Sequence, residues 1–278
     1  MKLEINKILL PLLLSCLIVI SCHKKHNTPE PSYTFTGGCS LLSEDINGVK
    51  ADSFVYNSNN QPSKIILYDS TGSVVTATLS ITYDTSGRYS KINFSQGNTA
   101  GYVTFEYNAQ NQLIGQYTYI SIPFFGAQKI DSVNFAYVGN NISKETNYTI
   151  ANSLLGTKRV VAVSYYTYDG NGNVLTETDS TSGALTDTYT YTYASEISPQ
   201  VIALSNAAID INNGKYPDFA YFNSKNTVLT MTHKDGSGNV LSDSYTSTYA
   251  YNSNGYPNTE LRQIGNKNYN YLYNYSCK

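Results

Sequence analysis

Tyr83-Asp84-Thr85-Ser86-Gly87-Arg88 is the stretch of sequence that decides the fold. Its pattern predicts a tight turn, because Asp84 suits the first position of a type I turn and Gly87 suits a position with positive φ. A type I turn followed by a left-handed glycine commonly joins two antiparallel strands. Strand-forming residues lie on both sides, so the stretch predicts a β-hairpin.

The same turn template recurs along the whole chain. Some copies replace the glycine by asparagine, which is the next-best residue for left-handed backbone geometry. One copy keeps the turn without the tyrosine. So many copies in one chain predict a repeat architecture. The further copies begin at Tyr56, Tyr68, Tyr107, Tyr137, Tyr168, Lys234 and Tyr251.

These turns resemble the tyrosine-aspartate (YD) repeats of RHS-type proteins, through Tyr83–Arg88 and the Asp-Gly-Asn-Gly-Asn-Val-Leu stretch at residues 169–175. The chain also resembles Bacteroidetes lipoproteins that carry degenerate YD repeats, over residues 54–275 with a break near residues 196–226. The resemblance implies an array of β-hairpins and no activity, because the repeat is a structural unit in that family. Most turns lack the arginine, and the chain is far shorter than the large RHS shells. A closed, cargo-holding shell is therefore not expected.

Residues 1–21 predict a lipoprotein signal peptide. Two early lysines precede an apolar run at residues 8–20, which is too short to span a bilayer comfortably. Ser21 stands before Cys22 as in a lipobox, so we expect lipidation of the Cys22 thiol and cleavage on its N-terminal side. The alternative is an ordinary signal peptide with a cysteine there by chance.

Residues 22–38 predict a flexible tether, because proline, serine and glycine disfavour packed structure. His-Lys-Lys-His follows Cys22. The Bacteroidetes lipoproteins that the chain resembles tend to have acidic residues here when they are on the cell surface, so the resemblance implies the periplasmic face of the outer membrane for this basic stretch. Surface exposure stays the alternative. The two histidines have no further ligands nearby, so no metal site is expected there. Residues 39–278 form the predicted YD-repeat-like β domain.

Two cysteines remain in that domain, Cys39 and Cys277, at its two ends. The oxidising periplasm favours a disulfide between them, and the alternative is two free buried thiols. A disulfide would close a loop of about 240 residues and fasten the first element to the last strand.

Residues 51–195 predict an antiparallel meander, because short turn signals alternate with strand-like runs. Tyrosines share one face in residues 186–193, 245–251 and 269–275, with threonines on the opposite face in the first two stretches, which predicts a tyrosine face with hydroxyls that reach water. Residues 196–226 break the pattern, and Pro199 begins a predicted short helix around residues 199–209 that lies on the sheet. The predicted fold is all-β: YD/RHS-like hairpin repeats in a large twisted open sheet. An outer-membrane barrel is the disfavoured alternative, because a lipid-facing band is aliphatic and the face opposite the tyrosines is rich in threonine.

No catalytic, cofactor-binding or metal-binding motif stands out. The only histidine of the folded part, His233, lies at a predicted turn and is interpreted as a surface residue. The stretches from Asp169 and Asp235 begin like calcium loops but lack the glycine and glutamate that such loops need, so turns explain them. A formal net charge of −2 argues against a nucleic-acid partner.

The predicted function is a non-enzymatic cell-envelope lipoprotein, held at the membrane through Cys22, that acts as a binding or scaffold module. The 27 tyrosines and the low share of charged residues suggest a glycan or another envelope protein as ligand, since aromatic rings anchor such interfaces. The alternative is that the tyrosines have a purely structural role in the sheet. The second hypothesis is a glycan-directed hydrolase that uses a carboxylate pair from Glu106, Glu177 and Asp179.

Overall fold

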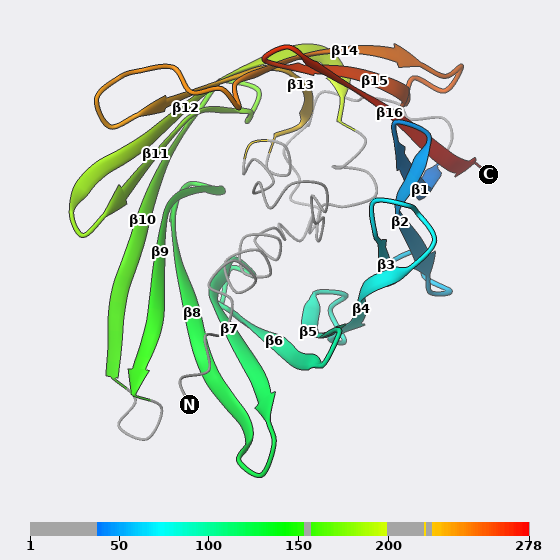
Figure 1. Cartoon of the computed structure of the whole chain (residues 1–278). Coiled ribbons are helices and arrows are strands. Elements are labelled where there is room, and N and C mark those ends of the chain that lie inside the picture. The colour runs from blue at the N-terminus through cyan, green and yellow to red at the C-terminus, as the bar shows by residue number, and fades with distance from the viewer. Residues whose placement is uncertain (1–37, 153–156, 199–219, 221–223, 278) are drawn as a thin grey trace.

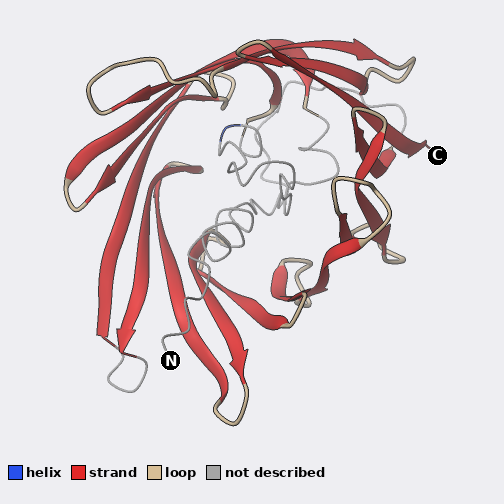
Figure 2. Ribbon diagram, viewed as in Figure 1, coloured by secondary structure: helices blue, strands red, loops and turns tan. Residues whose placement is uncertain are grey.

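The computed structural model describes residues 38–152, 157–198, 220 and 224–277. Sixteen strands form one antiparallel sheet that closes on itself as a barrel (Figures 1 and 2). The first eight strands are β1 (Cys39–Ile46), β2 (Val49–Tyr56), β3 (Pro62–Tyr68), β4 (Val75–Tyr83), β5 (Tyr89–Gln96), β6 (Thr99–Tyr107), β7 (Leu113–Ile122) and β8 (Gly126–Val138). The others are β9 (Asn141–Asn152), β10 (Thr157–Tyr168), β11 (Val174–Thr181), β12 (Ala184–Ile197), β13 (Asn226–Asp235), β14 (Tyr245–Tyr251), β15 (Pro257–Ile264) and β16 (Lys267–Cys277).

The antiparallel meander is confirmed, but the prediction of an open sheet is wrong. β16 pairs with β1, from Cys277 opposite Cys39 to Tyr271 opposite Ile46, so the ring has no edge strand. Each turn motif determines one hairpin only. Closure depends instead on pairing between the two ends of the domain, which no local pattern encodes. The helix predicted around residues 199–209 lies outside the described residues.

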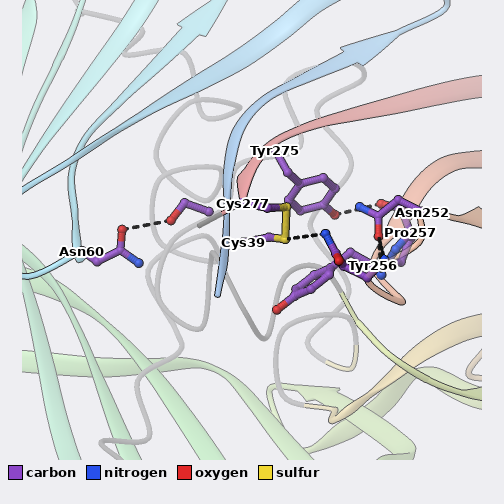
Figure 3. Close-up of a disulfide and its surroundings, with 9 residues drawn as sticks. Cys39, Asn60, Asn252, Tyr256, Pro257, Tyr275 and Cys277 are labelled. Atoms are coloured by element: carbon purple, nitrogen blue, oxygen red, sulfur yellow. Dashed lines mark hydrogen bonds between the residues drawn. A yellow bond between two sulfur atoms is a disulfide. The ribbon is translucent and has the colours of Figure 1, made fainter. Parts of the chain in front are cut away.

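A disulfide closes the barrel at the start of this seam (Figure 3). Cys39 Sγ and Cys277 Sγ are bonded at 2.00 Å. Ser40 Oγ donates a hydrogen bond to Asn60 Oδ1 at 3.0 Å, and Asn254 Nδ2 contacts Cys39 Sγ at 3.7 Å. Asn60 belongs to the turn after β2 and Asn254 to the turn after β14, so hairpins on both sides support the closing bond.

The repeated turns have the predicted geometry. In the turn after β4, Asp84 Oδ1 accepts hydrogen bonds from the N–H groups of Ser86 and Arg88, both at 2.9 Å, and Gly87 has a φ of 76°. A register shift immediately precedes Tyr83, as expected for a type I turn followed by a bulge. The same side-chain acceptor pattern occurs at Asn57, Asp69, Asn108, Asp169, Asp235 and Asn252.

The turn copies do not all lie at one end of the barrel. Even-numbered strands end at one rim, here called the tyrosine rim, which carries most copies. The turns at Tyr68 and Lys234 follow the odd strands β3 and β13 and lie at the opposite rim. The opposite rim also holds the predicted connections around Gly97, Pro123 and Ser182, whereas the connection at residues 153–156 lies outside the described residues.

Each even-numbered strand carries a tyrosine that binds the strand before it. Tyr83 Oη, for example, donates to the carbonyl of Pro62 at 2.6 Å, where β3 begins. These hydroxyls were expected to reach water. They bind backbone carbonyls instead, and so join the ends of the strand pairs that have no turn at the tyrosine rim. The eight bonds, 2.5–3.1 Å long, run from Tyr56, Tyr83, Tyr107, Tyr137, Tyr168, Tyr193, Tyr249 and Tyr275 to Leu41, Pro62, Tyr89, Leu113, Ile142, Val174, Val228 and Pro257.

Side chains also connect successive turns along the tyrosine rim. Gln61 Nε2 donates to the carbonyl of Gly87 at 3.2 Å. Arg88 forms a salt bridge with Asp84 at 2.6 Å and donates to Asn111 Oδ1 of the next turn at 2.9 Å. Gln61 and Arg88, which follow the asparagine or glycine position of their turns, therefore each contact the next turn along the rim.

The sheet has one buried face and one exposed face. A closed sheet curves around its inner face, so the buried side chains point inward. The tyrosines of β12 and β16 follow this rule: Tyr191 and Tyr273 are buried, whereas Thr190 and Thr192 are exposed. The prediction that tyrosine and threonine occupy opposite faces is confirmed.

The outer wall is polar. Hydroxyl pairs join neighbouring strands, as between Thr167 and Thr176 and between Thr192 and Thr230, both at 2.6 Å. Lysines lie over outward tyrosine rings, with Lys91 Nζ 4.0 Å from the ring centre of Tyr102. An outer-membrane barrel presents an aliphatic band to lipid, whereas the exposed aliphatic residues of this wall, such as Leu175, Leu261 and Leu272, are accompanied by these polar groups.

Removal of the disulfide should weaken the whole barrel. Cys39→Ser is expected to lower the free energy of unfolding by about 2–5 kcal/mol, because the unfolded chain regains the freedom of a very long loop. Cys277→Ser should lose a similar amount, and the double variant should lose no more than either single variant. Denaturant unfolding measures this, and a double variant far less stable than both singles would contradict a shared bond.

The tyrosine bonds should each contribute to stability. Tyr83→Phe keeps the ring and removes the hydroxyl, which donates to Pro62 and also interacts with the side chain of Tyr89, so we expect a loss of about 1 kcal/mol in unfolding free energy. The matched control is Tyr165→Phe on the outer wall, where 48% of the residue is exposed and no change is expected. Equal effects of the two substitutions would refute the proposed role of the rim tyrosines.

Candidate functional site

The inner wall divides into two halves of different chemistry. Strands β1–β6 present aliphatic and aromatic side chains, among them Leu41, Ile65 and Ile92, which belong to one buried cluster. Strands β7–β13 present many carboxylates, hydroxyls and amides on the same inner face, beside a second buried apolar cluster that includes Leu113, Val133 and Val228. The site therefore lies on the second half, here called the polar wall, made of Gln116, Thr118, Asp131, Glu145, Asn147, Ser164, Tyr166, Glu177, Asp179, Asp187, Tyr191 and His233.

Strand register places the carboxylates of the polar wall in rows. Ser164 lies opposite Glu145 on one side and opposite Asp179 on the other, and Asp179 lies opposite Asp187. Directly opposite residues share a face of the sheet and have neighbouring side chains. A second row runs from Tyr166 through Glu177 and Tyr189 to His233. Two neighbouring rows thus bring four acidic groups together from three strands.

Tyrosine and asparagine side chains bind two of these acids. Glu145 accepts from Asn147 Nδ2 at 2.9 Å and from Tyr166 Oη at 3.3 Å. Glu177 accepts from Tyr191 Oη at 3.1 Å. These donors come from the same strand or from the strand beside it, so the polar wall is a connected network.

Burial makes these carboxyl groups weak acids. Burial raises the pKa of Glu145 to about 7, against the hydrogen bonds that it accepts from Asn147 and Tyr166. Burial likewise raises the pKa of Asp179 to about 6, and the charge of Asp187 adds to the rise. Near neutral pH such groups exchange protons easily, so each can either donate or accept a hydrogen bond.

His233 is buried, and its interpretation as a surface residue is wrong. Only 7% of the residue is exposed. Its Nε2 lies 2.8 Å from Asp187 Oδ1, its Nδ1 lies 2.9 Å from Asp243 Oδ1, and its ring stacks on Tyr189 at 4.2 Å. The partners come from β12 and from the connection before β14. The pairing of β12 with β13 brings Asp187 and Tyr189 to His233, whereas Asp243 belongs to the connection that follows β13.

Three polar residues at the edge of the polar wall keep buried atoms without hydrogen-bond partners. These atoms are Gln116 Oε1 and Nε2, Thr118 Oγ1 and Asp131 Oδ1. Thr118 of β7 lies directly opposite Asp131 of β8, and Gln116 lies two residues from Thr118 on the same face. Burial raises the pKa of Asp131 to about 7. Buried polar groups normally have partners, so this cluster needs an explanation.

A polar network on β14–β16 has a different character, because its charges satisfy each other. Glu260 accepts from Ser247 Oγ at 2.7 Å, from Tyr273 Oη at 2.6 Å and from Arg262 Nε at 2.7 Å. The guanidinium of Arg262 lies between the rings of Tyr245 and Tyr271, 4.7 and 4.6 Å from their centres. The polar groups of this network bind one another, so the network stabilises the barrel.

The structure separates the three acids of the hydrolase hypothesis. Glu177 and Asp179 lie on the inner face of β11. Glu106 lies on the outer face of β6, five strands away, where it accepts a hydrogen bond from Tyr117. The three therefore cannot form one catalytic group.

The other sequence-based sites have structural roles or lie outside the description. The carboxylates of Asp169 and Asp235 accept turn N–H groups, as stated above. Cys22 lies outside the described residues. Among the residues that the structure describes, no cluster of three or more His, Cys, Asp or Glu side chains fits a metal ion.

A shallow groove of about 700 Å³ lies at the tyrosine rim between the turns after β2 and β4. Its lining is mostly amide and hydroxyl groups, and its carboxylate, Asp84, is paired with Arg88. The groove therefore lacks the converging carboxylates that glycoside hydrolysis would need. The polar wall is the better candidate for ligand binding, because hydrogen-bonding groups and aromatic rings gather there.

Comparison with known proteins identifies the fold. A porin-like protein from Bacteroides uniformis matches with a TM-score of 0.52 and 13% identity, over 87% of this chain and 98% of that chain. A porin-like protein from Bacteroides vulgatus matches with a TM-score of 0.53 and 10% identity, over 85% and 99%. Identity this low shows a shared fold alone.

Other comparisons add little. TcdB2-TccC3 matches with 15% identity over 79% of this chain and 12% of that chain, and its TM-score of 0.26 does not show a shared fold. No protein-family model matches the chain. No curated protein matches it either. No helix among the described residues is long and apolar enough to cross a bilayer.

The buried acids should make stability depend on pH. Because folding raises the pKa of Asp131, Glu145 and Asp179, the folded chain keeps protons that the unfolded chain loses above about pH 4. Their stabilising contribution is thus complete below the unfolded pKa and is lost as the pH rises through about 6 to 7. Glu145→Gln should reduce the fall in melting temperature between acidic and neutral pH.

The quantity to measure is the difference between wild type and Glu145→Gln in the pH dependence of the melting temperature. Hydrogen bonds from turn N–H groups hold the pKa of Asp84 and Asp169 below the usual value, against the opposing effect of burial, so these groups favour stability at higher pH. Thermal unfolding across the pH range separates the two contributions. An unchanged pH slope in Glu145→Gln would contradict the account of the buried acid.

Proposed function

We propose that this chain is a non-enzymatic, lipid-anchored protein of the cell envelope that binds a glycan on the polar wall of its barrel. The observation that carries the proposal is the gathering of carboxyl, amide, hydroxyl and tyrosine groups on one half of the inner face. Sugars present many hydroxyl groups, each of which donates and accepts hydrogen bonds, together with apolar ring faces. Such a ligand matches a surface of this composition.

Three features support an envelope location. The lipobox at Cys22 suits export and anchoring. The disulfide between Cys39 and Cys277 suits an oxidising compartment. The fold is similar to that of porin-like proteins from two Bacteroides species. Because the outer wall is polar, we propose that the barrel lies outside the lipid. The lipid anchor then holds it at the periplasmic face of the outer membrane.

The polar wall favours binding over catalysis. Glu177 and Asp179 lie two residues apart on one strand, so their carboxyl groups face the same side. A glycosidase places its two carboxyl groups on opposite sides of the scissile bond. The available acids therefore suit hydrogen bonding to sugar hydroxyls. Another envelope protein as ligand is the alternative outcome of the binding test.

Isothermal titration calorimetry of the full-length protein with cellotetraose, chitotetraose and mannotetraose tests the proposal. We expect at least one of these sugars to bind. Glu177→Gln on the polar wall should weaken that binding about tenfold, because it changes a hydrogen-bonding group that faces the ligand. The matched control is Glu106→Gln, the same substitution on the outer wall, which should leave the affinity unchanged.

Two results would refute the proposal. If none of the three sugars binds, glycan binding fails and co-purification of envelope proteins becomes the next experiment. If Glu106→Gln weakens binding as much as Glu177→Gln does, the ligand does not lie on the polar wall. Release of reducing ends during incubation with a bound sugar would instead support the hydrolase.

A further inference from the structure

The connection between β7 and β8 carries two phenylalanines that are exposed to solvent. Phe124 is 105% exposed and Phe125 is 75% exposed, so neither ring is buried by the barrel. Exposed apolar groups that gather at one place mark a surface for another molecule or for a membrane. We propose that these two rings insert into the surface of an anionic phospholipid bilayer and hold the barrel against it. This inference goes beyond the proposed function and does not depend on glycan binding.

The end of this hairpin is a two-stranded arm. β7 and β8 pair as far as Ile122 opposite Gly126. The pairing of β8 with β9 stops at Asp131 opposite Thr149, so the first residues of β8 have a partner strand on one side only. Figure 1 shows the β7–β8 hairpin projecting from the ring at the bottom of the view. The two phenylalanines therefore lie at the tip of an arm, away from the inner wall.

The backbone at Phe124 suits a different residue type. Phe125 N–H donates to the carbonyl of Ile122 at 3.1 Å, so Pro123 and Phe124 occupy the two central positions of this turn. Phe124 has a φ of 69°, a left-handed conformation that glycine or asparagine adopts more readily. The turn geometry therefore does not require an aromatic ring, and the packing of the barrel does not use one. An apolar environment outside the barrel accounts for the phenylalanine.

Other exposed apolar side chains lie at the same end of the barrel as the arm. This end is the rim opposite the tyrosine rim. Val74 and Val75 follow β3, Leu185 lies near the start of β12, and Val240 belongs to the connection after β13. Their exposed fractions are 58%, 51%, 50% and 61%. A bilayer is broad enough to contact several connections of one rim together.

Positive charges behind the tip favour an anionic surface. Lys129 follows Phe125 by four residues, which is about 13 Å along an extended strand. Lys158 and Arg159 are exposed near the start of β10. Burial lowers the pKa of Lys129, and the nearby charge of Lys158 lowers it further, against the charge of Glu106. No carboxylate of the described residues forms a salt bridge with any of the three cations, so lipid phosphates match them.

Outward tyrosines near this rim suit the boundary between water and lipid. Tyr102 and Tyr119 stack with their ring centres 4.7 Å apart. Lys158 Nζ lies 5.3 Å from the ring centre of Tyr148. Tyrosine combines an apolar ring with a polar hydroxyl and is for that reason concentrated at membrane interfaces. The arm thus has phenylalanines at its tip, with tyrosines and lysines behind them where lipid headgroups would lie.

A bilayer fits this arm better than a protein partner does. A stable protein interface buries about 800 Å² on each side and needs a complementary shape. Two rings at the end of a narrow hairpin present a small convex surface. Lipid needs no complementary shape, so a second copy of the chain or another protein is the less suitable occupant.

The arm and the predicted lipid anchor can contact the same bilayer. β1 begins with Cys39 at the tyrosine rim, whereas the arm lies at the opposite rim. The 13 residues of β8 span about 43 Å. Residues 23–38, between the predicted anchor and β1, can span at most about 55 Å. The tether is therefore long enough for the arm to face the leaflet that holds the Cys22 lipid.

Vesicle flotation of the predicted mature chain, residues 22–278, tests the proposal. The chain carries Cys22→Ser, so that no acyl chain contributes to binding. We expect it to bind vesicles of phosphatidylethanolamine and phosphatidylglycerol more tightly than vesicles of phosphatidylcholine alone. The double substitution Phe124→Asn and Phe125→Ser should weaken binding to the anionic vesicles at least about tenfold, because two apolar rings are lost from the contact.

Three further variants separate the contributions. Val138→Ser is the matched control, because Val138 is 73% exposed at the other end of β8, and it should leave vesicle binding unchanged. Lys129→Gln with Lys158→Gln should weaken binding to anionic vesicles by about fivefold for each charge removed, without affecting neutral vesicles. Phe124→Asn alone should weaken binding without lowering the melting temperature, because asparagine accepts the positive φ.

Several results would overturn the inference. If the chain without the phenylalanine substitutions binds neither kind of vesicle, the arm does not contact lipid. If Val138→Ser weakens binding as much as the double phenylalanine variant does, the contact is not at the arm. A lower melting temperature of Phe124→Asn would show that the ring stabilises the barrel. Dimerisation that the double variant abolishes would assign the arm to a second copy of the chain. Because none of these measurements uses a sugar, failure of glycan binding leaves this inference intact, and its own failure leaves the proposed function intact.

Discussion

Hydrogen bonding between β1 and β16 turns a linear meander into a ring, and the remaining structure is arranged around that seam. Without the seam, both terminal strands would expose unpaired N–H and C=O groups. The disulfide holds the two strands in register at the tyrosine rim, where β1 begins and β16 ends. At this rim all the remaining pairs of neighbouring strands are joined either by a connection of the chain or by a tyrosine hydroxyl. The disulfide provides the covalent link at the place where the chain itself has none.

Closure also gives the two faces of the sheet different surroundings. Side chains on the concave face converge, so tyrosines, aliphatic groups and acids all become buried there. The acids of the polar wall consequently lose contact with water, and the pKa values of Glu145 and Asp179 rise. On β14–β16 the buried acid has a partner of opposite charge, because Arg262 neutralises Glu260. Around Asp131 there is no such partner, and Asp131 Oδ1 stays without a hydrogen bond.

Local features of the fold could be predicted from the sequence, because the residues that determine them are neighbours in the chain. Asp84 and Gly87 lie within one turn and fix its geometry. The alternation of tyrosine and threonine in residues 186–193 fixes which side chains face inward. The disulfide partners were also a clear expectation, since only two cysteines remain in the domain.

Features that depend on distant pairing could not be predicted. His233 has the sequence context of a surface turn residue, but the pairing of β12 with β13 places Asp187 on one side of its ring, and Asp243 of the following connection lies on the other. Glu106 and Glu177 look alike in sequence but lie on opposite faces, because bulges shift the alternation between strands. The cluster of Gln116, Thr118 and Asp131 carries no sequence signal, since its meaning comes from burial and from absent partners.

Hydrogen–deuterium exchange of the backbone amides of β1 and β16 tests the closed ring most directly. Amides that pair across the seam should exchange as slowly as those of an interior pair such as β4 and β5, because closure leaves no edge strand. An open sheet would leave β1 and β16 each with an unpaired side. Fast exchange of these amides, with slow exchange of β4 and β5, would contradict the closed barrel and the inner wall derived from it.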